Sequence, residues 1–133
     1  MRLKHFSVAY GLQIFKSFSD EARIRILFLI FQNKHMCISD LEHILDFTQT
    51  KTSRHLSYLK NSGIVNAKKF DQWVFYTIKD EVLEILSQMF KFLNKDQMLL
   101  KDAETFRILF SNRELALNKP EVQKWMAQQN LSK

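Results

Sequence analysis

Residues that break helices are scarce in this chain, which has two glycines and one proline among 133 residues. Along most of its length, apolar residues recur every three or four positions, as they do on one face of an α-helix. Both features favour a largely helical protein. We predict helices over Phe6–Phe18, Asp20–Gln32, about Asp40–Leu45, a stretch capped by Thr48 and ended by Gly63, Asp80–Leu93, about Asp96–Phe110, and a last short helix opened by Pro120.

Short polar residues mark the starts of several of these helices, because their side chains can accept a hydrogen bond from a free backbone N–H. Ser19 is predicted to cap the second helix, with Asp20 and Glu21 in its first turn, where the helix dipole favours acids. Ser39 and Glu42 form a capping-box pattern at the short third helix. The residues that the second helix should turn toward the core are Ile24, Leu27, Phe28 and Phe31.

The periodicity changes between Ile64 and Ile78. This stretch is rich in β-branched and aromatic residues, and Asp71-Gln72 stands where a turn would divide it. The pattern predicts a β-hairpin. The order helix, helix, short helix, helix, hairpin, helix is that of a winged helix-turn-helix. We therefore expect a mostly α (α+β) fold with a two-stranded wing and a helical C-terminal extension.

Basic residues concentrate between Thr48 and Lys79, a segment whose only acid is Asp71. Six bases against one acid give this segment +5, compared with a formal net charge of +6 for the whole chain. The bases are Lys51, Arg54, Lys60, Lys68, Lys69 and Lys79. Each Lys or Arg set against a phosphate releases condensed counterions, so a compact basic helix and hairpin favour a polyanionic partner. We predict that this partner is double-stranded DNA.

The helix after Thr48 has the faces that a recognition helix needs. At 100° per residue, Thr52, Leu56 and Leu59 should pack inward, with His55 beside them in a structural role. The opposite face is polar, and there Arg54 could bind a guanine through two hydrogen bonds. Contacts with base edges are predicted for Gln49, Thr50, Lys51, Ser53 and Arg54. Contacts with phosphates, which set the register, are predicted for Ser57, Tyr58, Lys60, Lys68 and Lys69.

Several segments resemble signatures of the ArsR/SmtB family of bacterial repressors. The stretch from Phe15 to Leu27, FKSFSDEARIRIL, resembles the first family signature, and Thr48–Leu56, TQTKTSRHL, resembles the recognition helix. The matching residues that follow are Leu59-Lys60, Gly63-Ile64-Val65 and Trp73-Val74-Phe75-Tyr76. The resemblance covers about Phe15 to Leu109. It implies a dimeric winged-helix repressor, often released from its operator by a metal ion or another signal.

Two predicted helices, Phe6–Phe18 and the one containing Val82 to Leu93, carry more apolar residues than one core-facing stripe needs. The resemblance implies that they pair across a two-fold axis, which would place two recognition helices one DNA turn, roughly 34–36 Å, apart on an inverted repeat. The predicted homodimer interface contains Phe6, Tyr10, Ile14, Val82, Leu86, Met89 and Leu93. The alternative is that these stripes pack against the C-terminal helices of the same chain. We place DNA binding and dimerisation in residues 1–110, and treat residues 111–133 as a helical extension of the same domain.

Family members that sense arsenite or soft metals carry two cysteines at the start of the short helix. Here Cys37 is present, but the second position is Ser39, and one thiolate does not make a tight soft-metal site. Another family site uses Asp and His in the late dimer helix, and Asp80–Leu93 contains no histidine. His35 and His43 match no known ligand spacing with Cys37. We predict no metal site and no cofactor, and the sequence identifies no inducer. The alternative is a repressor that responds to metal, arsenite or oxidation, with Cys37 as the candidate sensing residue.

Several other classes of protein are disfavoured. A single cysteine excludes an internal disulfide and fits a reducing compartment. The longest apolar run, Ile26–Phe31, is too short to cross a bilayer, and Gln13 and Lys16 interrupt any signal-like apolar core. We therefore expect a cytoplasmic protein without a membrane partner. The sequence has no glycine-rich phosphate loop and no recognisable pattern of catalytic residues, so we expect no enzyme. A winged helix used only for protein interaction is the rival hypothesis.

Overall fold

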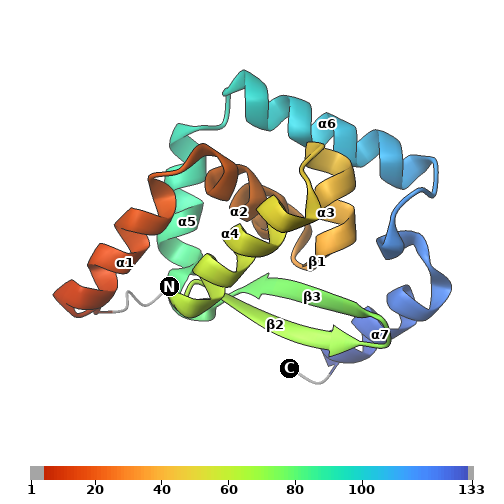
Figure 1. Cartoon of the computed structure of the whole chain (residues 1–133), viewed down its shortest axis with the longest axis horizontal. Helices are drawn as coiled ribbons and strands as arrows, with labels where there is room; N and C mark the ends of the chain where they lie inside the picture. Colours follow the sequence, from red (N-terminus) through yellow and green to blue (C-terminus); the bar gives the residue numbers. More distant parts are fainter. Residues whose placement is uncertain (1–4, 132–133) are drawn as a thin grey trace.

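A computed structural model describes residues 5–131 of the chain (Figure 1). Its elements, in order, are α1 Val8–Phe18, α2 Glu21–Asn33, β1 Met36–Cys37, α3 Ile38–Leu45, α4 Gln49–Asn61, β2 Val65–Phe70, β3 Trp73–Ile78, α5 Asp80–Phe92, α6 Gln97–Ser111, the 3₁₀ turn η1 Ala116–Asn118, and α7 Pro120–Leu131. None of the helices within residues 5–131 has the length and apolar character needed to span a bilayer.

The predicted hairpin is confirmed. Strands β2 and β3 pair antiparallel from Val65↔Ile78 to Phe70↔Trp73, and the turn between them places Asp71 at φ 53°. A third, two-residue strand was not predicted: β1 pairs with the other edge of β3, in the sheet order β1-β3-β2. The fold is thus a mostly helical winged helix-turn-helix, in which α3 and α4 form the helix-turn-helix and β2–β3 form the wing (Figure 1).

Helix α2 lies at the centre of the core, because it packs against every other helix from α1 to α6 and against the sheet. Of its predicted inward residues, Leu27 is fully buried, whereas Ile24, Phe28 and Phe31 are only half-buried. The prediction assumed one buried stripe, but a helix enclosed on several sides buries more of its surface. The residues it buries are Ala22, Ile26, Leu27, Leu29 and Ile30.

Two predicted helix caps are wrong by one or two residues. Asp20, not Ser19, caps α2, and its carboxylate accepts a hydrogen bond from the Arg23 backbone N–H at 3.1 Å. Ser19 instead ends α1, with its hydroxyl donating to the Lys16 carbonyl. The capping box predicted at Ser39 is absent, because α3 already begins at Ile38 and Ser39 is inside its first turn. Ser and Asp are both favoured at the N-cap, so the local sequence does not show which of the neighbouring residues Ser19 and Asp20 caps the helix.

The helices after the wing are fastened to the domain by two buried carboxylates. Asp102 of α6 is 3% exposed and accepts two hydrogen bonds from the Arg25 guanidinium of α2, both at 2.9 Å. Asp40 of α3 is also 3% exposed, and it accepts from the backbone N–H groups of Ala116 and Leu117 at 2.7 and 3.1 Å. These bonds join α3 to η1, across 76 and 77 residues of sequence.

Replacing Asp40 with Ala should destabilise the fold by about 2–4 kcal/mol, because two backbone N–H donors would lose their acceptor in a buried place. Burial raises the pKa of Asp40 above its ordinary value, although the two N–H donors favour the ionised form. Asp40→Asn keeps one acceptor oxygen and should lose less. The free energy of unfolding, measured with urea at pH 7, checks the order wild type, Asp40→Asn, Asp40→Ala. Equal stability of all three would show that the two bonds contribute nothing.

Candidate nucleic-acid interface

Helix α4 is anchored as the sequence predicts. The Thr48 hydroxyl accepts a hydrogen bond from the Lys51 backbone N–H at 3.1 Å, which caps the helix. Thr52, Leu56 and Leu59 are fully buried, and the Thr52 hydroxyl donates to the Thr48 carbonyl at 2.8 Å. His55 is 6% exposed, in agreement with its predicted structural role. These contacts fix both the axis and the rotation of α4, and therefore determine which residues face solvent.

The outward face of α4 is polar and carries no acid. A shallow depression on this face is lined by Gln49, Thr50, Ser53, Arg54 and Ser57. Four of these five side chains are exposed, and Ser53 is half-buried. All the residues predicted to touch base edges, apart from Lys51, thus lie together. Side chains that can donate paired hydrogen bonds, placed on an exposed helix, have the chemistry for contact with base edges.

Two of the predicted contact residues are partly engaged within the chain. The Lys51 ammonium lies 4.1 Å from the centre of the Phe47 ring, and the Tyr58 ring has the Arg23 guanidinium 4.1 Å from its centre. Arg23 also donates to the carbonyls of Lys16 and Ser17, so it connects α4 to the end of α1. Nothing in the sequence pattern indicated this role for Arg23, because its partners lie on two other helices. Lys51 and Tyr58 border the polar face.

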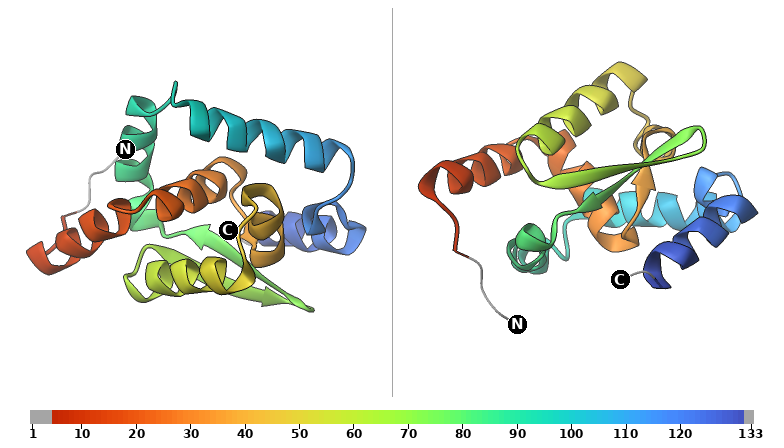
Figure 2. Two further views of the ribbon diagram at one scale, coloured as in Figure 1. Left: turned by 45° about the horizontal axis from the view of Figure 1, so that its top comes forward. Right: turned by 90° about the horizontal axis from the view of Figure 1, so that it is seen from below.

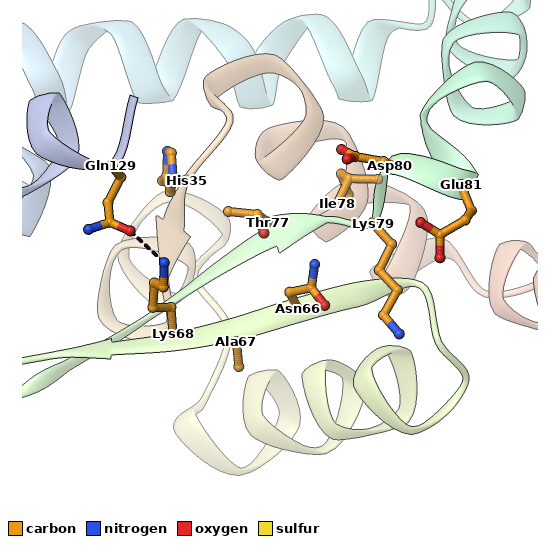
Figure 3. Close-up of a pocket in the computed structure, with 10 residues that line it drawn as sticks. All are labelled: His35, Asn66, Ala67, Lys68, Thr77, Ile78, Lys79, Asp80, Glu81 and Gln129. Atoms are coloured by element: carbon orange, nitrogen blue, oxygen red, sulfur yellow. Dashed lines mark hydrogen bonds between the residues drawn. The ribbon is translucent and has the colours of Figure 1, made fainter. Parts of the chain in front are cut away.

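The two wing lysines lie on opposite faces of the hairpin, because successive residues of a strand alternate. Lys68 is paired with Phe75, and its ammonium donates to the Gln129 amide oxygen of α7 at 2.5 Å (Figure 3). Lys69 is paired with Val74 and shares its face with Ala67, which points toward α4 in Figure 3. Of the two lysines predicted to hold phosphates, Lys69 therefore lies on the side of the recognition helix and Lys68 on the side of α7.

A cavity of about 710 Å³ lies on the α7 side of the sheet (Figure 3). Side chains of both charges line it, among them Lys68 and Lys79 from the hairpin region and Asp80 and Glu81 from the start of α5. Sites for organic ligands are usually walled mainly by apolar groups with a few polar ones. Because charged and polar groups dominate here, this cavity has the character of a solvated groove behind the wing.

Cys37, the candidate sensing residue, is 1% exposed. It occupies the N-cap position of α3, and its side chain makes no capping hydrogen bond. Its Sγ lies 3.3 Å from the Ser39 hydroxyl oxygen, and burial raises the pKa of the Cys37 thiol to about 11. The thiol is therefore protonated at neutral pH, whereas oxidation and metal binding both need the thiolate. Within residues 5–131, no group of three or more His, Cys, Asp or Glu side chains is arranged to hold a metal ion.

Three of the seven residues predicted for the dimer interface are buried within the single chain. Ile14, Val82 and Leu86 are at most 1% exposed within the single chain and belong to its own core, where a partner cannot reach them. The other predicted interface residues, Phe6, Tyr10, Met89 and Leu93, are half-buried against that core. The Tyr10 hydroxyl donates to the Gly63 carbonyl at 2.6 Å, which turns this side of α1 inward. The exposed apolar stripe of α1 is the opposite one, formed by Val8, Leu12 and Phe15.

His55 should make the stability of α4 depend on pH. Burial lowers the pKa of His55 below 6.5, helped by the charges of Arg23, Arg54 and Lys51 and opposed by Asp20. Below pH 6.5 the unfolded chain binds a proton that the folded chain accepts only at lower pH, so the free energy of unfolding falls as pH falls through this window.

We expect wild type to lose more stability than His55→Gln between pH 7.5 and 5.5, by at most about 1.4 kcal/mol, the limit that the unfolded-state pKa sets. Urea unfolding of both proteins at the two pH values measures the difference. Identical losses in wild type and variant would mean that folding does not perturb the titration of His55.

Comparison with known proteins agrees with this geometry. Residues 20–67, which include α2, α3 and α4, match the family described as "Bacterial regulatory protein, arsR family". The "Arsenic resistance transcriptional regulator ArsR1" of Pseudomonas putida is 36% identical over 78 residues, which are 59% of this chain and 61%, less than two thirds, of that protein. The "Uncharacterized HTH-type transcriptional regulator MJ1325" of Methanocaldococcus jannaschii is 43% identical over 75 residues, 56% of this chain and 84% of that protein.

Among solved structures, HlyU from Vibrio cholerae superimposes with a TM-score of 0.60 at 29% identity, and the alignment covers 64% of this chain and 92% of HlyU. The sequence matches identify the family, and the structural match agrees with the fold. The chain belongs to the ArsR family of bacterial transcriptional regulators.

Proposed function

We propose that the protein is a sequence-specific repressor that binds an inverted-repeat operator as a homodimer, with α4 in the major groove and the wing against phosphates. One observation carries most of this proposal. The polar face of α4 exposes Gln49, Thr50 and Arg54 together, while the buried side of the same helix fixes its orientation. A merely solvated helix needs neither the absence of acids on that face nor a basic hairpin beside it.

The roles of individual residues follow from their positions. Gln49, Thr50, Ser53 and Arg54 would contact base edges, with Lys51 reaching DNA after leaving the Phe47 ring. Leaving the ring costs little, because an exposed cation–π contact contributes only about 0.5–1 kcal/mol. The residues proposed to contact phosphates are Ser57, Tyr58, Lys60 and Lys69. We assign Lys69 rather than Lys68 to the wing contact, since Lys68 is directed toward α7 and bonded to Gln129.

The homodimer is proposed to form through the exposed stripe of α1. Val8 is 81% exposed, Leu12 52% and Phe15 67%, and they lie at helical spacing on one face. Such a contiguous apolar face on a helix that already buries its other side favours an isologous contact with a second copy. We place both DNA binding and dimerisation within residues 1–110, as the sequence predicted, and treat residues 111–133 as an extension of that domain.

The residues at the start of α3 do not support the inducing signal that the name of a relative suggests. The name of the Pseudomonas putida relative ArsR1 assigns that protein to arsenic resistance. In this chain the start of α3 offers one thiol, which is buried and protonated at neutral pH, and Ser39 offers a hydroxyl. Soft metals and arsenicals bind through several thiolates. We therefore propose that this protein does not sense arsenic through the start of α3.

Selection of retained fragments from random duplex DNA by the purified protein would test the proposal. We expect an enriched inverted repeat whose half-sites are 10–10.5 base pairs apart, centre to centre, or a multiple of that spacing. Fluorescence anisotropy should then show tighter binding to that duplex than to a scrambled one, with affinity that falls steeply as salt rises. Equal affinity for every duplex, or none, would favour the rival function as a protein-interaction module.

A further inference from the structure

Helix α7 covers the face of the wing that is opposite the recognition helix. Figures 1 and 2 show α7 behind the outer part of the hairpin, with α4 on the other side. Val122 is fully buried there, and the Trp125 ring packs against two residues of the hairpin. Its centre lies 5.0 Å from that of Phe70, with the planes within 15°, and 5.1 Å from that of Phe75.

These contacts hold the wing near its tip. Phe70 is the last residue of β2, directly before the Asp71-Gln72 turn, and its ring also stacks on Trp73 across the hairpin. Trp73, Phe70 and Trp125 therefore form a stack of three aromatic rings that begins beside the turn. The bond from Lys68 to Gln129 joins the same strand to the next turn of α7. β1 pairs with β3 only at Phe75 and Tyr76, so the outer part of the hairpin has two strands, and a two-stranded hairpin is marginally stable in water unless another element packs on it.

The other end of this extension is fastened to the helix-turn-helix. The η1 turn directly before α7 is held by the Asp40 carboxylate of α3, and α3 packs against α4. The segment from η1 to α7 thus connects the first helix of the helix-turn-helix to the tip of the wing. The hairpin also contacts α4 directly through β2, so this segment adds a second connection between the helix-turn-helix and the wing.

We propose that Trp125 is a positioning residue for DNA binding. By stacking on Phe70 it holds the wing at the angle at which Lys69 meets a phosphate while α4 occupies the major groove. Trp125 belongs to α7, which lies on the side of the wing away from α4, and its ring stacks on Phe70, so we expect no direct contact between Trp125 and DNA. This inference rests on the proposed DNA-binding function, but it also predicts a property of the free protein that can be measured without DNA.

The test compares Trp125→Ala with Trp125→Phe, which keeps an aromatic ring against Phe70. Affinity for the selected operator should fall about tenfold in Trp125→Ala, because a mobile wing loses its phosphate contacts, and should largely recover in Trp125→Phe. Gln128→Ala, an exposed change on the same helix, is the matched control and should bind as wild type does. Should Trp125→Ala fail to fold, Trp125→Leu keeps apolar volume without the stack and permits the same comparison.

A double-mutant cycle with Lys69→Ala separates positioning from general loss of stability. If Trp125 acts through the wing, Trp125→Ala should cost little further affinity once Lys69 is absent. In the free protein, amide hydrogen exchange across Phe70–Trp73 should rise about tenfold in Trp125→Ala while α4 stays protected.

Each outcome decides the inference. Unchanged operator affinity in Trp125→Ala, or an undiminished loss in the Lys69→Ala background, would overturn it. Unchanged exchange at the wing would overturn it even if wild type bound no duplex at all. If the wild-type protein bound no DNA but hydrogen exchange at the wing still rose in Trp125→Ala, the proposed function would be refuted. The inference that Trp125 holds the wing in place would then still be supported.

Discussion

Replacing Arg54 with Ala should weaken binding to the cognate operator at least about 30-fold, because a dimer loses two guanidinium contacts with bases. Each bidentate contact contributes about 1–3 kcal/mol of discrimination, so the expected loss is about 2–6 kcal/mol for the two half-sites. Arg54 is exposed and lines the shallow depression on the polar face of α4, where its guanidinium can reach a base edge. Anisotropy titrations against the selected operator and against a scrambled duplex measure the loss.

Lys69→Ala is the matched comparison, because it also removes one positive charge from the proposed DNA-facing surface. A phosphate contact does not depend on sequence, so Lys69→Ala should weaken operator and scrambled duplex about equally and should reduce the salt slope by about one per protomer. Arg54→Ala should instead reduce the difference in affinity between the operator and the scrambled duplex. If both variants weakened both duplexes equally, Arg54 would be a phosphate contact and base recognition would lie elsewhere on α4.

The part of the proposed DNA-binding surface that was predictable from sequence is the part determined by local interactions. Thr48 caps α4 through a residue three positions away, and the burial of Thr52, Leu56 and Leu59 follows from helical spacing alone. The hairpin was recognisable from its residue types and its turn. Strand β1 was not, because two residues are too few to show an alternating pattern.

The features that sequence did not reveal depend on contacts between distant segments. Asp40 looks like an ordinary first-turn acid of α3, and its partners at Ala116 and Leu117 become neighbours only in the folded chain. Trp125 likewise meets Phe70 across 55 residues of sequence. Helical periodicity showed that α1 has two apolar stripes, but periodicity cannot tell which stripe faces the chain's own core. The bond from Tyr10 to the Gly63 carbonyl settles that orientation.

The orientation of α1 leads to a second prediction with a large expected effect: Phe15→Glu should convert the proposed dimer to a monomer at micromolar concentration. Phe15 is 67% exposed in the single chain, beside Leu12 and Val8, so a charge there leaves the folded monomer intact. In an interface, burying one Phe side chain contributes about 1.5–3 kcal/mol, and two-fold symmetry counts each residue twice. The variant should therefore raise the dimer dissociation constant at least about 100-fold, since the buried carboxylate adds a desolvation cost to the lost apolar contact.

Sedimentation equilibrium measures the dissociation constant, and Phe15→Leu is the control at the same position, because it keeps an apolar side chain and should remain dimeric. Circular dichroism should show unchanged helix content in both variants, since Glu and Leu are good helix formers. Phe15→Glu should also lose the preference for an inverted repeat over a single half-site, because only a dimer gains from the second half-site. A Phe15→Glu protein that sediments as a tight dimer would place the two-fold contact on another surface. The Val8, Leu12 and Phe15 stripe would then be open to a different partner.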